Sequence, residues 1–184
     1  MAGRSASFRK FRNDVSAVAA LEFALIAPVM LFFYVGGVEL ANGLAINVKV
    51  TETAHTVSDL VSQNKCVTSA QVNVMLNASS AVIAPYAAAN AIVTVSELTT
   101  TGSGTATVTW SQSLNGTARS QGQTIPLPSS LSALPSNTGL ILGEAAYAYK
   151  PNLGYSITGT ILLGDSYFLY PRQTTFVPLQ TSCP

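Results

Sequence analysis

Apolar and polar residues are unevenly distributed along this chain. Residues 15–40 are almost continuously apolar, and Glu22 is the only charged residue from Val15 to Val38. A helix of about 20 apolar residues, rising ~1.5 Å per residue, crosses the ~30 Å hydrocarbon core of a bilayer. The run therefore predicts a transmembrane helix over residues 15–40.

The apolar positions become periodic after this run. Val50, Ala54, Val57 and Val61 follow one another at intervals of four, three and four residues, which places them on one face of a helix. We expect the helix to continue over residues 41–64, outside the membrane, and to pack this face against the rest of the chain.

Residues 65–184 predict a short helix followed by strands. Thr68 or Ser69 is a suitable N-cap for a helix to about Val82, and Pro85 would end it. Strands are expected, from β-branched runs and alternation, over residues 92–98, 105–112, 140–149, 156–163 and 166–177. Turns are expected at 101–104, 151–154 and 164–165, with a loop over 115–138. In the second strand, alternation places the side chains of Ala106, Val108 and Trp110 on one face.

These elements predict an α+β fold, in which a long N-terminal helix packs against an antiparallel sheet of about four or five strands. The combination resembles the general pilin plan of a helical spine and a sheet. That parallel concerns architecture alone and assigns no function.

The distribution of charge predicts the topology. Four of the nine basic residues lie in the first twelve positions, at Arg4, Arg9, Lys10 and Arg12. Because basic residues flank membrane helices on the cytoplasmic side, residues 1–14 read as a cytoplasmic leader and residues 65–184 as an extracytoplasmic domain. The net charge is +1. The sequence contains no basic stripe of the kind that would indicate nucleic-acid binding.

Glu22 needs an explanation, because an acid within the bilayer costs roughly 3 kcal/mol on insertion scales. One interpretation is a cleavable secretory signal, although the apolar run is longer than such signals require. A second is a plain anchor whose glutamate reaches towards the headgroups. A third is a leader that is removed just before the apolar run, so that Glu22 acquires a partner.

Residues 17–39 resemble the N-terminal signature of the TadE-like family, which assists assembly of tight-adherence (Flp-type) pili. The shared elements are a small residue, a Glu-Phe pair, an Ala-Leu step, a proline and a closing Gly…Glu. They are Ala17, Glu22-Phe23, Ala24-Leu25, Pro28 and Gly37…Glu39. The tyrosine-containing segments 147–151 and 167–172 are also similar to C-terminal segments of membrane-anchored members.

The resemblance implies a single-pass protein of the bacterial inner membrane, cut by a prepilin peptidase between Ala17 and Val18. Its expected partners are other pilins or pseudopilins and the pilus assembly platform. Cleavage would make Glu22 the fifth residue, and its carboxylate could then pair with the new α-amine of a neighbouring subunit. Pro28 lacks an N–H group and should loosen the helix shortly after Glu22.

Cys66 and Cys183 lie on the oxidising side in this topology. A bridge between them would fasten the C-terminus to the end of the long helix, whereas free thiols are disfavoured in that compartment. We therefore expect a disulfide. No cysteine spacing indicates a redox motif or a zinc site.

No catalytic constellation is evident in the sequence. Glu97 and Glu144 each have no other acidic residue near them in the sequence, and His55 is the single histidine. We expect neither enzymatic activity nor a metal or cofactor. Tyr147, Tyr149 and Tyr170 are a candidate partner-binding or glycan-binding patch, provided that the fold makes them contiguous and exposed.

The function expected is that of a membrane-anchored, pilin-like protein that assists pilus assembly. One alternative is an uncleaved periplasmic scaffold of the assembly or secretion platform. Another is a surface adhesin whose outer domain recognises a ligand.

Overall fold

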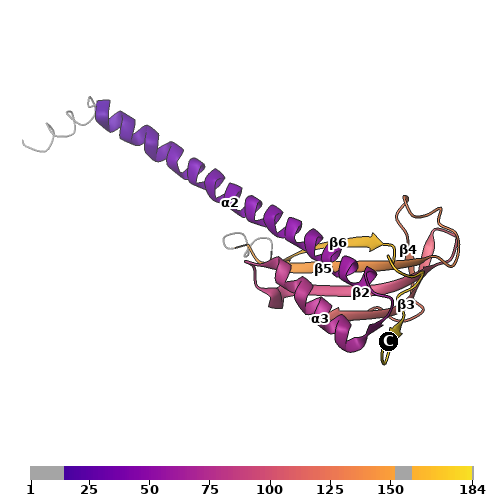
Figure 1. Cartoon of the computed structure of the whole chain (residues 1–184). Coiled ribbons are helices and arrows are strands. Elements are labelled where there is room, and N and C mark those ends of the chain that lie inside the picture. Colours follow the sequence, from indigo (N-terminus) through magenta and orange to yellow (C-terminus); the bar gives the residue numbers. More distant parts are fainter. Residues whose placement is uncertain (1–14, 152–158, 184) are drawn as a thin grey trace, which may run out of the picture. The chain divides into compact units, whose positions relative to one another are not determined.

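The computed structural model describes residues 15–151 and 159–183, with side chains described from Val18 onward (Figure 1). The chain divides into two compact units, Met1–Asn42 and Gly43–Pro184. The expected leader over residues 1–14 lies outside the described residues.

Helix α2 (Val15–Ser62) is one continuous helix of 48 residues, with Pro28 inside it. The apolar run and the periodic segment predicted from the sequence are therefore parts of a single element. Its residues from Gly43 onward belong to the second unit.

The second unit contains a five-stranded antiparallel sheet with the strand order β4-β3-β2-β5-β6. Its strands are β2 (Ala91–Thr100), β3 (Thr105–Leu114), β4 (Thr124–Pro126), β5 (Gly139–Tyr149) and β6 (Ile161–Leu169). A second, small sheet pairs β1 (Val67–Thr68) in parallel with β7 (Leu179–Gln180). The α+β prediction is confirmed.

Helix α3 (Ser69–Ser80) begins with a capping box. The Thr68 hydroxyl accepts the N–H of Gln71 at 3.3 Å, and the Gln71 Oε1 accepts the N–H of Thr68 at 2.8 Å. Each bond satisfies a donor that the first helical turn leaves unpaired. A 3₁₀ turn, η1 (Ala81–Ile83), follows the helix before Pro85, and a second, η2 (Ala88–Asn90), precedes β2.

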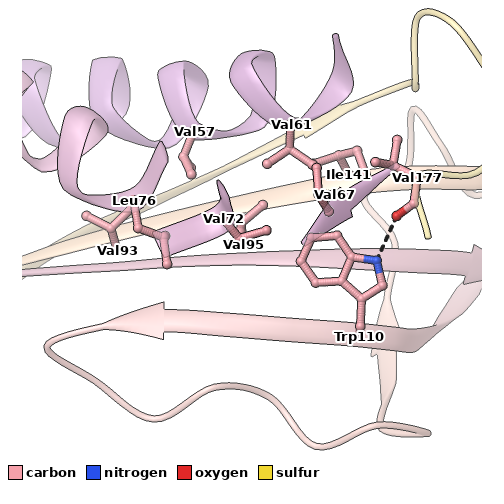
Figure 2. Close-up of a cluster of buried hydrophobic side chains, with 10 residues drawn as sticks. All are labelled: Val57, Val61, Val67, Val72, Leu76, Val93, Val95, Trp110, Ile141 and Val177. Atoms are coloured by element: carbon pink, nitrogen blue, oxygen red, sulfur yellow. Dashed lines mark hydrogen bonds between the residues drawn. The ribbon is translucent and has the colours of Figure 1, made fainter. Parts of the chain in front are cut away.

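The periodic face of α2 is buried as predicted. Val50, Ala54, Val57 and Val61 have no exposed surface. Figure 2 shows one buried cluster, in which helix side chains meet strand side chains and the Trp110 indole lies near Val177. Its members are Val57, Val61, Val67, Val72, Leu76, Val93, Val95, Trp110, Ile141 and Val177.

Gly143 permits the close approach of α2 to β5. A Cβ built at this position would collide with the Ser58 Oγ, the Ala54 carbonyl and the Val57 side chain. The Ser58 hydroxyl donates to the Ala54 carbonyl at 2.8 Å, so this contact contains helix backbone that cannot easily move aside. The distance between helix and sheet therefore depends on the absence of a side chain at Gly143.

A β-bulge changes which face of the sheet the β3 side chains occupy. Glu97 pairs with Trp110 and Leu98 pairs with Val108, so Thr109 is an extra residue in β3. The expectation that Ala106, Val108 and Trp110 share a face is wrong, because the extra residue reverses the alternation. Trp110 joins the cluster of Figure 2, whereas Ala106 and Val108 join a separate cluster with Leu98, Leu140 and Leu142.

Two sequence predictions about strands were also wrong. A single strand, β6, runs straight through Gly164 and Asp165, where a turn between two strands was expected. Both residues stay in antiparallel register, opposite Ala146 and Ala145, and Asp165 accepts a hydrogen bond from the Thr51 hydroxyl. The predicted loop over 115–138 contains the short strand β4.

We predict that Gly143→Ala lowers the free energy of unfolding of the full-length protein by about 1–3 kcal/mol, because an added methyl group must push α2 away from β5. Denaturant unfolding of the purified protein in detergent would measure the change. Gly164→Ala is the matched control, since its Cβ would meet the Ala145 carbonyl at an ordinary 3.6 Å. Equal effects of the two substitutions would contradict the close-contact argument.

Candidate functional site

The N-terminal part of α2 presents a mostly apolar surface that Glu22 interrupts. Phe23, Leu25 and Phe32 are exposed by 69%, 69% and 75%, and the most apolar window of the helix has no buried residue. By length and composition, this helix is able to cross a membrane. So much apolar surface is stable only against lipid or other apolar helices.

The residues of the expected processing site lie along this segment. Val18, Glu22, Phe23 and Pro28 are exposed residues of α2. Ala17 also lies in the helix, but its side chain is outside the described residues. Glu22 is the only carboxylate between Val18 and Glu39, so it is the single strongly polar point on an otherwise apolar surface.

Pro28 changes the backbone of this segment without ending the helix. It has no N–H to donate to the carbonyl of Ala24, so the ladder of helical hydrogen bonds is interrupted between Ala24 and Pro28. In an apolar environment such a carbonyl is satisfied by neighbouring groups or by local adjustment of the helix.

The sequence of this helix can be compared with known protein families. Residues 17–58 match the family model described as TadE-like protein. This part of helix α2 is similar to the TadE-like family. Neither the search of curated proteins nor the search of solved structures found a match.

The TadE-like match covers more of the chain than the signature that suggested it. It includes the apolar segment with Glu22 and Pro28, and it extends to residue 58, where Val50, Ala54 and Val57 are buried against the sheet. The match supports a role associated with the tight-adherence pilus and an association with its assembly machinery.

The C-terminal segment (residues 170–183) is fastened to the end of α2. Arg172 forms an ion pair with Asp59, and its backbone N–H donates to the Ser62 carbonyl at 2.8 Å. Cys66 and Cys183 lie at disulfide distance, with their Cα atoms 6.0 Å apart. The sequence indicated the cysteine pair, but it carried no signal for the Arg172–Asp59 contact.

Glu97 also holds the C-terminal segment, through a hydrogen bond with Val177, and the sequence analysis missed this role. Its side chain is 1% exposed, and a carboxylate oxygen accepts the N–H of Val177. The Trp110 Nε1–H donates to the carbonyl of Val177 at 2.8 Å (Figure 2). Burial raises the pKa of Glu97, and hydrogen bonds from Val177 and Trp110 offset part of that rise.

The candidate tyrosine patch is not formed. Tyr147 is only 6% exposed and packs in a cluster with Ile46 and Val50, because its position in β5 faces α2. Tyr149 is partly buried against the same cluster. Tyr170 is 48% exposed, but it follows Leu169, which pairs with Ile141 at the opposite end of β5.

A polar groove lies on the sheet face that carries Glu144. The Arg119 Nε and Nη2 donate to the two Glu144 oxygens at 2.6 and 2.5 Å, and this contact raises the pKa of Arg119. The pair ties the loop after β3 to β5. Within the part of the chain that the structure describes, no group of three His, Cys, Asp or Glu residues is placed to hold a metal ion.

We predict that replacing both Cys66 and Cys183 by serine lowers the free energy of unfolding by about 4–5 kcal/mol, since the bridge would close a loop of more than 100 residues. Denaturant unfolding with and without reductant would measure the change. The double variant should be insensitive to reductant. If reductant left the wild-type protein equally stable, no bridge would connect these cysteines.

We predict that the stability of the wild-type protein declines, relative to Glu97→Gln, as the pH rises above about 4.5. The raised pKa means that the folded protein keeps a proton that the unfolded chain releases near its ordinary pKa of 4.5. Unfolding is therefore favoured progressively until the pH passes the folded-state pKa. Glutamine keeps the acceptor for Val177 and has no proton to lose. Unfolding free energies measured from pH 4 to 8 that run parallel for the two proteins would contradict this.

Proposed function

We propose that this chain is a membrane-anchored, pilin-like protein that assists the assembly of tight-adherence (Flp-type) pili. The observation that carries the proposal is the match of residues 17–58 to the TadE-like model on a helix whose apolar surface includes Glu22. The role is structural and non-enzymatic, because it consists of packing helices together.

Processing is the first step of the proposed mechanism. A prepilin peptidase cuts between Ala17 and Val18 and removes the basic leader. The new N-terminus carries a positive α-amine four residues before Glu22. An ion pair between Glu22 of one subunit and this amine of its neighbour offsets the cost of placing the carboxylate in an apolar environment.

The pair also sets the axial position of one helix relative to the next. Apolar packing alone permits helices to slide, because it is non-directional. A single charged contact within an apolar surface favours one register. Pro28, six residues further on, permits the helix to bend as it packs among its neighbours.

The topology follows from the charge distribution. The basic residues before the apolar run support a topology with the N-terminus in the cytoplasm of a bacterial inner membrane and the second unit in the periplasm. The partners are then other pilins or pseudopilins in the membrane and the pilus assembly platform. The alternative is a scaffold that keeps its leader and stays in the membrane.

We predict that the protein isolated from native membranes has an intact mass that begins at Val18. Mass spectrometry under reducing and non-reducing conditions would measure it. Substituting Ala17 by a large side chain, as in Ala17→Leu, should block processing and leave the full-length mass. A full-length mass for the wild-type protein would sink the cleavage step and leave the uncleaved scaffold.

We predict that Glu22→Gln fails to restore pilus assembly in cells that lack this protein, because the carboxylate that pairs with the amine is gone. Counting assembled pili after complementation is the measurement. Glu52→Gln is the matched control on the same helix, where the side chain is exposed and pairs with Lys49. Full assembly with Glu22→Gln would refute the pairing, and full assembly without the protein would refute the function.

A further inference from the structure

The two edges of the five-stranded sheet differ in length and in composition. One edge is β4, which has three residues and ends at Pro126, a residue without an N–H group. The other edge is β6, which has nine residues and pairs with β5 along its whole length without a shift of register. Within residues 15–151 and 159–183, no strand pairs with the outer side of β6 (Figure 1).

An unprotected edge strand presents a row of unpaired backbone donors and acceptors. Proteins commonly block such edges with proline, lysine, a bulge or a very short strand. The β4 edge is short and contains proline, whereas β6 has none of these four features. Its described protection is the charge of Asp165 and one hydrogen bond, at 3.3 Å, from the Ser58 hydroxyl of α2 to the Tyr167 carbonyl. Its Leu162 and Tyr167 side chains are exposed by 66% and 39%.

The charge of β6 restricts what can add to this edge. Asp165 is its only charged residue and lies at its midpoint. The carboxylate accepts the Thr51 hydroxyl at 2.5 Å and the backbone N–H of Ser166 at 2.8 Å, and the residue is exposed. The negative charge is therefore held in place at the edge.

A second copy of this chain is a poor partner for the edge. Antiparallel pairing of β6 with another β6 about the midpoint would place Asp165 opposite its own copy. Like charges directly opposite one another destabilise a strand pair. A strand with a basic residue at that position would instead gain an opposite-charge pair, flanked by apolar contacts with Leu163 and Tyr167 on the same face.

We propose that β6 is a docking edge for a β-strand of a different protein, which carries lysine or arginine opposite Asp165 and apolar residues on either side of it. The partner extends the sheet by main-chain hydrogen bonds, and the charge and apolar side chains select it. The inference concerns the second unit alone and is independent of processing in α2.

The experiment is photo-cross-linking of the full-length protein in its native cells. The photoreactive residue p-benzoylphenylalanine replaces Leu162 in β6 and, as the matched control, Thr124 in the blocked edge β4. We expect an adduct with one other protein from position 162 and none from position 124. Peptide mapping should place the adduct within a segment that contains a basic residue.

Charge variants then test the pairing. Asp165→Lys should lower the yield of the adduct by at least about fivefold. Thr51→Val is the comparison variant, because it removes the hydrogen bond that positions Asp165 and keeps the charge at the edge. Its adduct yield should fall much less than that of Asp165→Lys. Replacing the partner's basic residue by aspartate should restore the adduct in the Asp165→Lys background.

Each contrary result overturns the proposal. An adduct with a second copy of this chain would assign the edge to self-association. An adduct that is insensitive to Asp165→Lys would show that the charge does not select the partner. If position 162 gave no more adduct than the Thr124 control, Asp165 would serve only to prevent aggregation at this edge. If Asp165→Lys fails to fold, Asp165→Asn replaces it, with a smaller loss of adduct expected.

Discussion

The second unit depends on the direct contact of helix α2 with strand β5. Four apolar side chains of the helix are buried without remaining exposure, and Gly143 lets the helix backbone rest on the strand. The contact gives one face of the sheet its apolar cover, and α3 and Val177 complete the same cluster. The TadE-like match ends inside this packed stretch, so the family pattern includes the residues that join the helix to its own sheet.

The C-terminal segment depends on that contact in turn. It is held by polar and covalent links at the end of α2 and by Val177 in the core. Glu97 accepts the N–H of Val177, and Trp110 donates to its carbonyl. A buried acid and an indole therefore replace the backbone partners that a neighbouring strand supplies elsewhere in the sheet. The burial that makes Glu97 an effective acceptor also raises its pKa.

Local patterns predicted much of this fold. The spacing of Val50, Ala54, Val57 and Val61, the cap at Thr68 and the strands around the 101–104 turn depend on neighbouring residues, and all are present in the structure. The errors concern long-range contacts. Alternation cannot reveal the bulge at Thr109, and Gly164-Asp165 reads as a turn until Thr51, 114 residues away, supplies a hydrogen bond. Glu97 looked isolated because Val177 lies 80 residues further along the chain.

The link between Cys66 and Cys183 has a mechanical consequence. Helix α2 ends at Ser62, four residues before Cys66. When these cysteines are bonded, tension applied between the helix and the last residues of the chain passes through that short connection and the sulfur atoms. The strands carry none of this load, so the sheet can remain folded while the protein is pulled from both of its ends.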